Sequence, residues 1–226
     1  MTDTPRFELF SYWRTSAVYR VRVALNLKGL AAAERTIDLD VGEQHTAEFR
    51  KINPLGAIPA LIDREAAPSQ APITQSLAIL EYLEEVHPKP AILPADAYGR
   101  ARVRALALML AADTHPLIVA RIRGYIKGVG KFDDADWRAW QVHWLTTGLQ
   151  ALEQRLASER ETSKFCHGDE PTIADICVAS IITAARVFKI KVDGIPTVDR
   201  IMAACEAMDA FAKADPYRQA GAPAPG

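Results

Sequence analysis

The chain has 226 residues, of which 49% are hydrophobic and 24% are charged, an ordinary composition for a globular protein. Its formal net charge is −1, which gives no basis for nucleic-acid binding. No apolar run approaches the roughly 20 residues that a membrane helix needs, and the polar segment 1–6 lacks the apolar core of a signal peptide. We therefore expect a cytoplasmic protein without nucleic-acid or membrane partners.

Cysteine usage excludes two further kinds of framework. The three cysteines are Cys166, Cys177 and Cys205, an odd number without a C-x-x-C pair. Neither disulfides nor a metal site is expected, because both need paired or closely spaced ligands. Buried thiols that act as small apolar groups are the better interpretation.

The first predicted elements are a strand over residues 7–12 and a helix that runs to Lys28 and ends at Gly29. One side of this helix carries the apolar residues Ala17, Val21, Ala24 and Leu25, whereas Arg20, Arg22 and Lys28 fall mostly on other sides. Thr15 and Ser16 lie at the turn between strand and helix. Their hydroxyls would face unpaired backbone N–H groups at the positive end of a helix, which suits an anion. An ordinary N-cap is the alternative.

The next segments complete a small α/β pattern. We expect a strand over 34–39, a short helix over 43–52, a strand over 57–63, a short strand that ends at 73–74, and a helix over 75–86. Pro59 is awkward within a strand because it lacks an N–H. The commoner solution is an edge strand. The rarer one is a cis peptide bond before Pro59, which would leave the backbone of Ile58 free to pair with something else.

Composition changes after a proline-rich linker. Ala, Leu and Arg dominate from Tyr98 onward at helical spacing, and Pro116 should interrupt the long helix. Trp137, Trp140 and Trp144 form a stripe that we interpret as core packing. Further helices are expected from Thr172, where Asp175 completes a capping-box variant, and over 198–211. The expected organisation is an α/β domain over 1–87, a linker over 88–97 and an all-α domain over 98–226.

A small α/β domain followed by a helical domain resembles the soluble glutathione transferases, over nearly the whole chain. The segment 14–25, with sequence RTSAVYRVRVAL, is similar to the zeta-class signature. Other shared features are Asn53-Pro54 with Ile58-Pro59, the segment 75–79, and the turn and helix around Gly168-Asp169 and Asp175. The resemblance implies a thioredoxin-like N-terminal domain, a helical C-terminal domain and a homodimer.

The resemblance also implies a glutathione site. Ile58 and Pro59 would form the cis-proline segment that pairs with the cysteinyl part of glutathione. Gln75 and Ser76 would bind its γ-glutamyl group, although simple helix capping is the alternative for these two. The remaining implied glutathione contacts are Gln44, at the glycine end, and His115.

By resemblance, the activity is cis–trans isomerisation of a maleyl-type keto acid, either maleylacetoacetate or maleylpyruvate, in aromatic amino-acid catabolism. A hydroxyl from Thr15, or from Ser16 if the turn is rotated, would stabilise the glutathione thiolate. The thiolate would add to the cis double bond, allow rotation and leave again. The substrate is a dianion, and the arginines at family-matched positions are Arg14, Arg121 and Arg186. We expect them to form one positive pocket beside the sulfur, in a crevice between the domains.

Three departures from the family pattern leave alternatives open. Thr15-Ser16-Ala17 stands where zeta enzymes commonly have Ser-Ser-Cys, Ile118 and Val119 replace a usual pair of asparagines, and Asp193-Gly194 replaces a leucine-threonine. One alternative is a general transferase that conjugates small electrophiles, with Ile118 and Val119 widening a hydrophobic site. The other is a non-catalytic binding module on the same fold.

Overall fold

A computed structural model describes residues 4–67 and 69–224 of the chain. The chain forms two compact units, the first made of residues 1–91 together with 208–226, and the second of residues 92–207. The sequence placed residues 208–226 with the helical domain. They group with the first unit because Asn26 donates a 2.9 Å hydrogen bond to the carbonyl oxygen of Ala210 and Trp13 packs on Tyr217 with ring centroids 5.7 Å apart.

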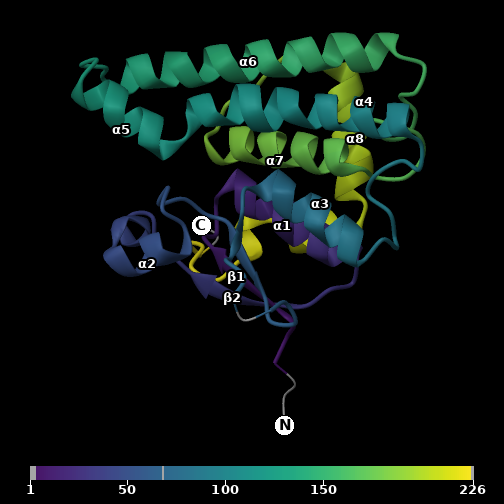
Figure 1. The fold of residues 1–226 in the computed structure, drawn as a ribbon. Helices are drawn as coiled ribbons and strands as arrows, with labels where there is room; N and C mark the ends of the chain where they lie inside the picture. Colours follow the sequence, from purple (N-terminus) through teal and green to yellow (C-terminus); the bar gives the residue numbers. More distant parts are fainter. Residues whose placement is uncertain (1–3, 68, 225–226) are drawn as a thin grey trace. The chain divides into compact units, whose positions relative to one another are not determined.

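The first unit contains a mixed sheet and helices in a thioredoxin-like order (Figure 1). In its described residues the strand order is β2-β1-β3-β4, with β1 parallel to β2 and antiparallel to β3, and with β3 antiparallel to β4. Its elements are β1 (Phe7–Ser11), α1 (Ser16–Leu27), β2 (Ala32–Thr36), η1 (Glu43–His45), α2 (Ala47–Ile52), β3 (Ala60–Asp63), β4 (Ile73–Thr74), α3 (Ser76–Val86), α9 (Asp209–Lys213) and η4 (Pro216–Arg218).

Alternation along β1 and β3 gives this sheet two apolar faces. Phe10 pairs with Ala60 and packs with Phe49 of α2 in one cluster, in which the rings of Phe10 and Phe49 lie 5.9 Å apart. Leu9 pairs with Leu61, and because successive side chains alternate, both point to the opposite face and are buried there. Figure 1 shows α1 and α3 side by side over the sheet. The sheet is thus covered on both faces.

Pro59 immediately precedes β3, and the peptide bond between Ile58 and Pro59 is cis. Because β3 lies between β1 and β4, it is an internal strand, and the expected edge strand is wrong. The ladder begins at Ala60, so proline is placed before the first pairing residue, where its missing N–H leaves no gap. The rarer of the two sequence interpretations is therefore confirmed.

The basic residues Arg20 and Arg22 of α1 and its C-cap residue Lys28 are buried, which corrects the expectation that they lie away from the core. Arg22 donates to Glu34 at 2.6 Å and Lys28 to Glu84 at 2.7 Å. Arg20 is 2% exposed and donates to the hydroxyl of Ser76 at 3.1 Å. Burying an unpaired charge costs free energy, and each of these three cations has a polar partner on another element that offsets this cost.

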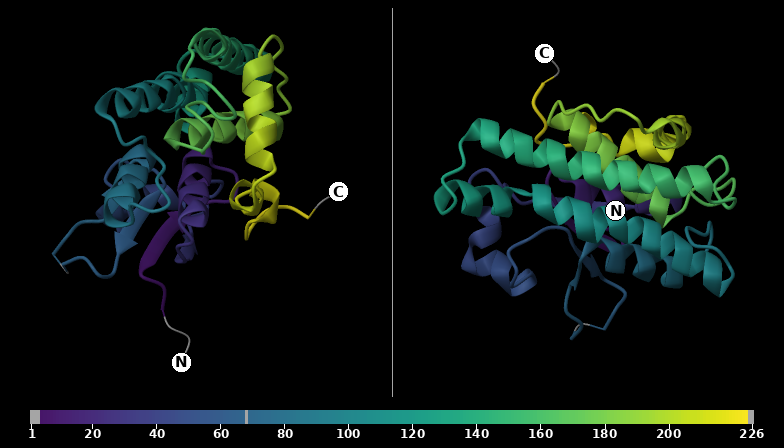
Figure 2. Two further views of the ribbon diagram at one scale, coloured as in Figure 1. Left: turned by 90° about the vertical axis from the view of Figure 1, so that its right-hand side faces the viewer. Right: turned by 90° about the horizontal axis from the view of Figure 1, so that it is seen from above.

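The second unit is helical (Figure 2). Its elements are α4 (Ala97–Leu108), η2 (Met109–Thr114), η3 (His115–Ile118), α5 (Ala120–Gly128), α6 (Asp134–Ser158), α7 (Ile173–Val187) and α8 (Pro196–Glu206). Pro116 interrupts the first long helix as expected, with a π-helical η2 and a 3-10 η3 before α5. The expected helix over 198–211 is wrong, because α8 ends at Glu206 and α9 begins separately at Asp209.

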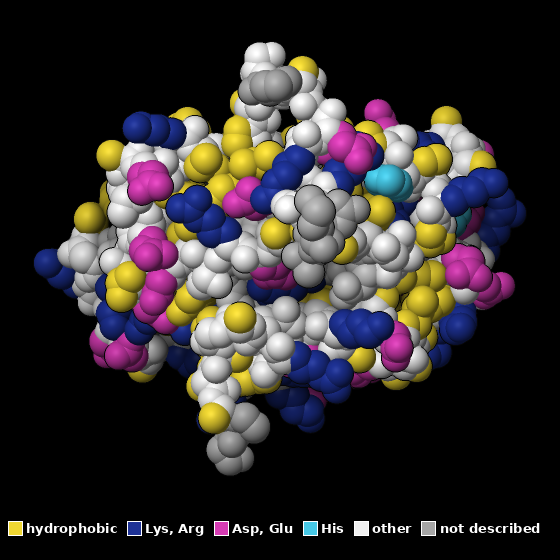
Figure 3. Space-filling model, turned by 90° about the horizontal axis from the view of Figure 1, so that it is seen from below, with side chains coloured by type: hydrophobic (Ala, Val, Ile, Leu, Met, Phe, Trp, Pro, Cys, Tyr) yellow, Lys and Arg dark blue, Asp and Glu magenta, His cyan; other side chains and the backbone are white. Residues whose placement is uncertain are grey.

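One helical run is apolar enough to cross a membrane by length and composition alone. It spans Ala97–Gly128, with a mean hydropathy of 1.4 in its most apolar window. The core helix of a soluble protein passes the same test, and this run is broken between α4 and α5, so it is weak evidence for a membrane span. On the face shown in Figure 3, basic and acidic side chains are interspersed, in line with the near-zero net charge.

Candidate functional site

The first candidate group lies at the start of α1, where Thr15 is the last residue before the helix. Its backbone is extended, with φ −82° and ψ 127°, and its side chain makes no capping hydrogen bond. The half-buried Thr15 hydroxyl lies 3.5 Å from the carbonyl oxygen of Tyr12, at the outer limit of a hydrogen bond. Ser16 follows as the first helical residue and is buried. The ordinary N-cap bond is therefore not formed, and the Thr15 hydroxyl is available at the positive end of α1.

Arg14 comes immediately before this hydroxyl and is exposed. It forms an ion pair with Asp40, and its guanidinium lies 5.4 Å from the ring centre of Tyr12 and 5.6 Å from that of Trp13. The Tyr12 hydroxyl donates to the other oxygen of Asp40 at 2.6 Å. Burial and this hydrogen bond to Asp40 raise the pKa of Tyr12. The Arg14 charge is thus held beside α1 and is partly compensated by a carboxylate.

Gln44 lies in η1, and its side-chain oxygen is buried without a hydrogen-bond partner in the described part of the chain. The turn after α2 fixes the neighbouring backbone. Gly56 adopts φ +64°, and a Cβ at this position would lie 2.9 Å from the carbonyl oxygen of Gln44. Only glycine permits this close approach. A buried acceptor without a partner is unusual in a folded protein, and a ligand N–H could complete it.

Ile58 and Pro59 lead into β3 from that turn. Ile58 is half-buried and lies outside the ladders, which begin at Ala60. The side-chain amide of Asn53 donates to the carbonyl oxygen of Ala57 at 2.6 Å and holds the chain just before Ile58. The segment is therefore fixed in place while its Ile58 backbone is not used in the sheet.

The start of α3 is the second open helix terminus. Gln75 adopts φ +69° and ψ 115°, a conformation that L side chains rarely take, and it makes no capping hydrogen bond. Ser76 is the first helical residue, is 6% exposed and accepts from Arg20. Simple helix capping by Gln75, the alternative left open by the sequence, is not formed. Backbone strain of this kind is often found where a ligand is bound.

The second unit carries the other three predicted site residues. His115 begins η3 and is half-buried. Arg121 lies exposed in the first turn of α5, and among the described residues it forms no ion pair. Arg186 lies in the last turn of α7 and forms an ion pair with Glu206 of α8. Arg14 belongs to the first unit, so one shared arginine pocket stays a prediction.

Sequence reasoning missed Arg20 as a neighbour of the site. Its guanidinium joins α1 to the first residue of α3, across 56 residues of sequence. Helical periodicity places a charged residue on the solvent side, and no residue near Arg20 in the sequence indicates its contact with the Ser76 hydroxyl. The one available signal was its position within the zeta-like segment 14–25.

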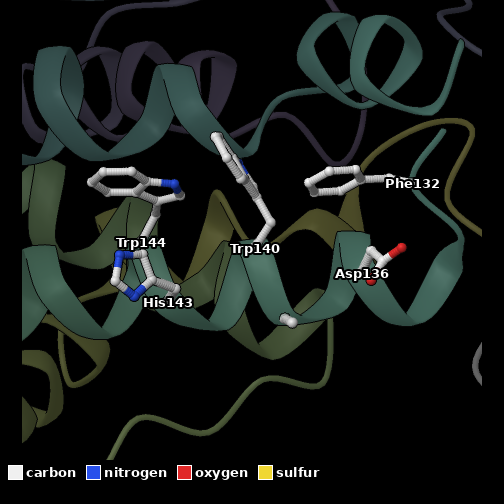
Figure 4. Close-up of a pocket in the computed structure, with 6 residues that line it drawn as sticks. Phe132, Asp136, Trp140, His143 and Trp144 are labelled. Atoms are coloured by element: carbon white, nitrogen blue, oxygen red, sulfur yellow. The ribbon is translucent and has the colours of Figure 1, made fainter. Parts of the chain in front are cut away.

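The tryptophan stripe on α6 is only partly core, which corrects the prediction. Trp137 is buried, but Trp140 and Trp144 are half-buried and line an open groove of about 420 Å³ (Figure 4). Trp140 donates to the carbonyl oxygen of Leu117 at 2.7 Å, and its ring stacks edge-on against Trp144 at 5.8 Å. The indole N–H of Trp144 is buried without a partner in the part of the chain that the structure describes. The groove is completed by Phe132, Asp136, Ala139 and His143.

A thioredoxin-like unit with two open helix starts beside a cis-proline segment, together with a separate helical unit, defines a soluble glutathione transferase. Comparison with known proteins agrees. Residues 5–85 match the family model described as "Glutathione S-transferase, N-terminal domain".

Relatives and solved structures narrow the class. The chain is 39% identical to a probable maleylacetoacetate isomerase of Vibrio cholerae, covering 93% of this chain and 96% of the relative. It is 38% identical to a maleylpyruvate isomerase of a Ralstonia species, covering 94% and 98%. A crystal structure of maleylacetoacetate isomerase from Methylobacterium extorquens AM1, with bound malonate and glutathione, has a TM-score of 0.92 and 44% identity, covering 96% of this chain and 100% of that one. The chain belongs to the zeta-class maleylacetoacetate and maleylpyruvate isomerase family.

Proposed function

We propose that this protein is a glutathione-dependent cis–trans isomerase of a maleyl-type keto acid. The observation that carries the proposal is the pair of open helix starts in the first unit, each with a hydroxyl residue beside it, in a chain similar along its length to named isomerases. A similar structure has both malonate and glutathione bound, which supports a dicarboxylate substrate, since malonate is a small dianion.

The residues of the first unit fit glutathione. The unpartnered side-chain oxygen of Gln44 can accept from a ligand N–H. The Ile58 backbone lies outside the sheet ladders and can pair with an extended peptide. Gln75, Ser76 and the N–H groups of the first turn of α3 can hold a carboxylate. We assign these residues, with Pro59 shaping the segment and His115 as a further contact, to glutathione binding.

Thr15 is the proposed hydroxyl donor to the ligand sulfur, with Ser16 as the alternative. When bound, glutathione supplies a thiolate that adds reversibly to the cis carbon–carbon double bond and so permits rotation. A free thiol has a pKa near 8.5, and lowering it by about two units takes roughly 2.7 kcal/mol. A hydrogen bond to a charged group supplies about 1.5–3 kcal/mol, and the helix dipole about 0.3–1 kcal/mol. The Thr15 hydroxyl is therefore the larger contribution, and α1 assists.

Arg121 is the best supported of the three substrate arginines. A cation in the first turn of a helix is unfavourably placed against the dipole, so Arg121 and α5 are together suited to an anion. Arg14 and Arg186 already pair with Asp40 and Glu206, so for them to bind substrate, these ion pairs have to rearrange. Arginine suits a carboxylate because its fork can donate two parallel hydrogen bonds.

The two alternative functions have less support. Ile118 is 3% exposed and Val119 is the half-buried residue before α5, so their apolar side chains do not open a wider hydrophobic site. The Thr15 hydroxyl, which makes no capping bond at α1, and the uncapped start of α3 count against a non-catalytic module. A homodimer in the cytoplasm completes the proposal on the strength of the family resemblance, and light scattering tests the dimer.

The test is turnover of maleylpyruvate and maleylacetoacetate with catalytic glutathione, beside conjugation of chlorodinitrobenzene. Arg121→Met is expected to lower isomerisation by about tenfold or more, because a charged hydrogen bond is lost in the transition state. Conjugation of the uncharged electrophile should stay within about twofold of wild type, since only the thiolate is needed. Arg123→Met is the matched control, because Arg123 lies two residues on and pairs with Asp134 at 2.9 Å. Equal loss of both activities in Arg121→Met, or no loss, contradicts the isomerase assignment of Arg121.

A further inference from the structure

A buried cation lies directly behind the first residue of α3. Arg20 projects from α1 and is among the largest fully buried side chains of the chain. Its Nη1 donates to the Ser76 hydroxyl oxygen at 3.1 Å, and this bond is itself buried. A guanidinium stays protonated at any physiological pH. Arg20 therefore brings a permanent donor to a hydroxyl at the candidate glutathione site.

This bond determines what Ser76 can do. A hydroxyl has one proton and two acceptor positions. Because Arg20 occupies an acceptor position, the Ser76 proton is directed to another partner. The N–H groups at the start of α3 need acceptors as well, since the first intrahelical bond runs from the N–H of Ile79 to the carbonyl oxygen of Gln75. One acceptor with several lone pairs, such as a carboxylate, satisfies both.

We propose that Arg20 is a positioning residue for the γ-glutamyl carboxylate of glutathione, acting through Ser76. It fixes the Ser76 rotamer and polarises the hydroxyl, because hydrogen bonds in a chain strengthen one another in a buried environment. The inference rests on the proposed glutathione site and adds to it a residue that does not touch the ligand. The group recognised at this end of the ligand is a carboxylate and not a neutral amide.

Lys28, the C-cap residue of the same helix, supplies a matched control. It also joins α1 to α3, through its 2.7 Å bond to Glu84, and it is also buried. It lies at the opposite end of α3 from Ser76, since Glu84 is in the last turn of that helix. A merely structural role in joining α1 to α3 is therefore shared by Arg20 and Lys28, whereas recognition through Ser76 belongs to Arg20 alone.

The experiment measures calorimetric affinities for glutathione and for its analogue in which the γ-glutamyl α-carboxylate is a carboxamide. Wild type should prefer the carboxylate, and Arg20→Met should reduce that preference by about tenfold, in line with the loss of an ionic contribution. Lys28→Met should keep the wild-type preference even if its stability falls. In the Ser76→Ala background, Arg20→Met should reduce the preference no further, because Arg20 acts through Ser76.

The KM for glutathione should rise in Arg20→Met while kcat at saturating glutathione stays within about twofold.

If Arg20→Met does not fold, the same preference for the carboxylate is measured in Arg20→Lys. It keeps the charge but loses the fixed geometry of the guanidinium, so the preference should fall by about threefold. An unchanged preference in either Arg20 variant overturns the inference, as does an equal loss of affinity for both ligands. If wild type binds no glutathione, the proposed function fails instead.

Discussion

Helices α6 and α7 of the second unit begin in a different way from helices α1 and α3 of the first unit. At the start of α6 in the second unit, Asp133 accepts from the N–H of Asp136 at 2.8 Å, and Asp136 accepts from the N–H of Asp133 at 3.1 Å. At the start of α7, buried Asp175 accepts from both the N–H and the hydroxyl of Thr172 at 2.8 Å. It also accepts from the N–H of Cys166 at 2.7 Å. These starts are closed by residues of the chain itself.

In the first unit, α1 and α3 begin without a capping side chain. Thr15 is a preferred capping residue that does not cap, and Gln75 is held at a positive φ. Natural helices seldom leave such groups unused when a hydroxyl is at hand. At α6 and α7 the polar groups of the helix start stabilise the fold, whereas the uncapped starts of α1 and α3 are consistent with the proposed glutathione site. Four variants test this comparison, from the largest expected effect to the smallest.

Asp175→Ala should have the largest effect on stability. It removes three hydrogen bonds and leaves the N–H groups of Thr172 and Cys166 buried without a partner, so we expect a loss of about 3–5 kcal/mol in the free energy of unfolding. Burial raises the pKa of Asp175, so its carboxyl depends on these donors for its ionised form. Denaturant titration measures the loss. A change below about 1 kcal/mol would contradict a closed, stabilising helix start.

Thr15→Val should change ligand chemistry and leave stability nearly unchanged. It keeps the shape of the side chain and removes the hydroxyl, so the pKa of bound glutathione should rise by about one to two units. Ultraviolet absorbance of the thiolate against pH measures the shift. Ser16→Ala is the matched variant. If the thiolate titration shifts to higher pH in Ser16→Ala and is unchanged in Thr15→Val, the hydroxyl donor is Ser16.

The first unit also has a closed polar cluster, which sharpens the comparison. Arg6 donates to both oxygens of Asp63, at 2.8 and 2.6 Å, and the Tyr82 hydroxyl donates to the same carboxylate at 2.6 Å. The Arg6 hydrogen bond lowers the pKa of Asp63 from 3.8 to about 2. A carboxyl whose pKa is lower in the folded state stabilises above its unfolded pKa, and this stability is lost as pH falls through the folded value.

Asp63→Asn should therefore destabilise by about 1–2 kcal/mol at pH 6, and this difference from wild type should shrink as pH falls from about 4 toward 2. Denaturant midpoints at several pH values measure it. Glutathione affinity should not change, since Asp63 is bonded to Arg6 and Tyr82 and is not among the residues proposed to bind glutathione. If the stability difference between Asp63→Asn and wild type did not depend on pH, the Arg6 contact would not be what lowers the pKa of Asp63.

Asp133→Ala should have the smallest effect. The capping box of α6 is exposed, so its loss should cost about 1 kcal/mol and leave glutathione affinity unchanged. The thermal midpoint and calorimetry measure the two quantities. Weakened glutathione binding in this variant would contradict the division between closed and open starts.

Many of the elements of the fold were predictable from local sequence. The turn before α1, the capping-box variant at Thr172 and the interruption at Pro116 each follow from residue types within a few positions. Local patterns also gave the bounds of α3 to within one residue. The shifted strand is a smaller error, since β2 covers Ala32–Thr36 and the prediction began at residue 34.

What failed depended on partners far along the chain. Arg20 and Lys28 each meet a partner 56 residues away, and no periodicity shows that contact. Trp140 and Trp144 share the helical spacing of Trp137, yet only Trp137 is buried, because spacing identifies one face without saying what covers it. Helix starts that look alike in sequence differ for the same reason, since a capping residue does not reveal whether it caps.

The most direct test measures glutathione affinity and the unfolding midpoint together, in Ser76→Ala and in Asp133→Ala. Ser76→Ala should weaken glutathione binding by about tenfold or more. It should also lower the midpoint, because it removes the buried hydroxyl that accepts from Arg20. Asp133→Ala should lower the midpoint and leave the affinity unchanged. Wild-type affinity in Ser76→Ala would contradict the account.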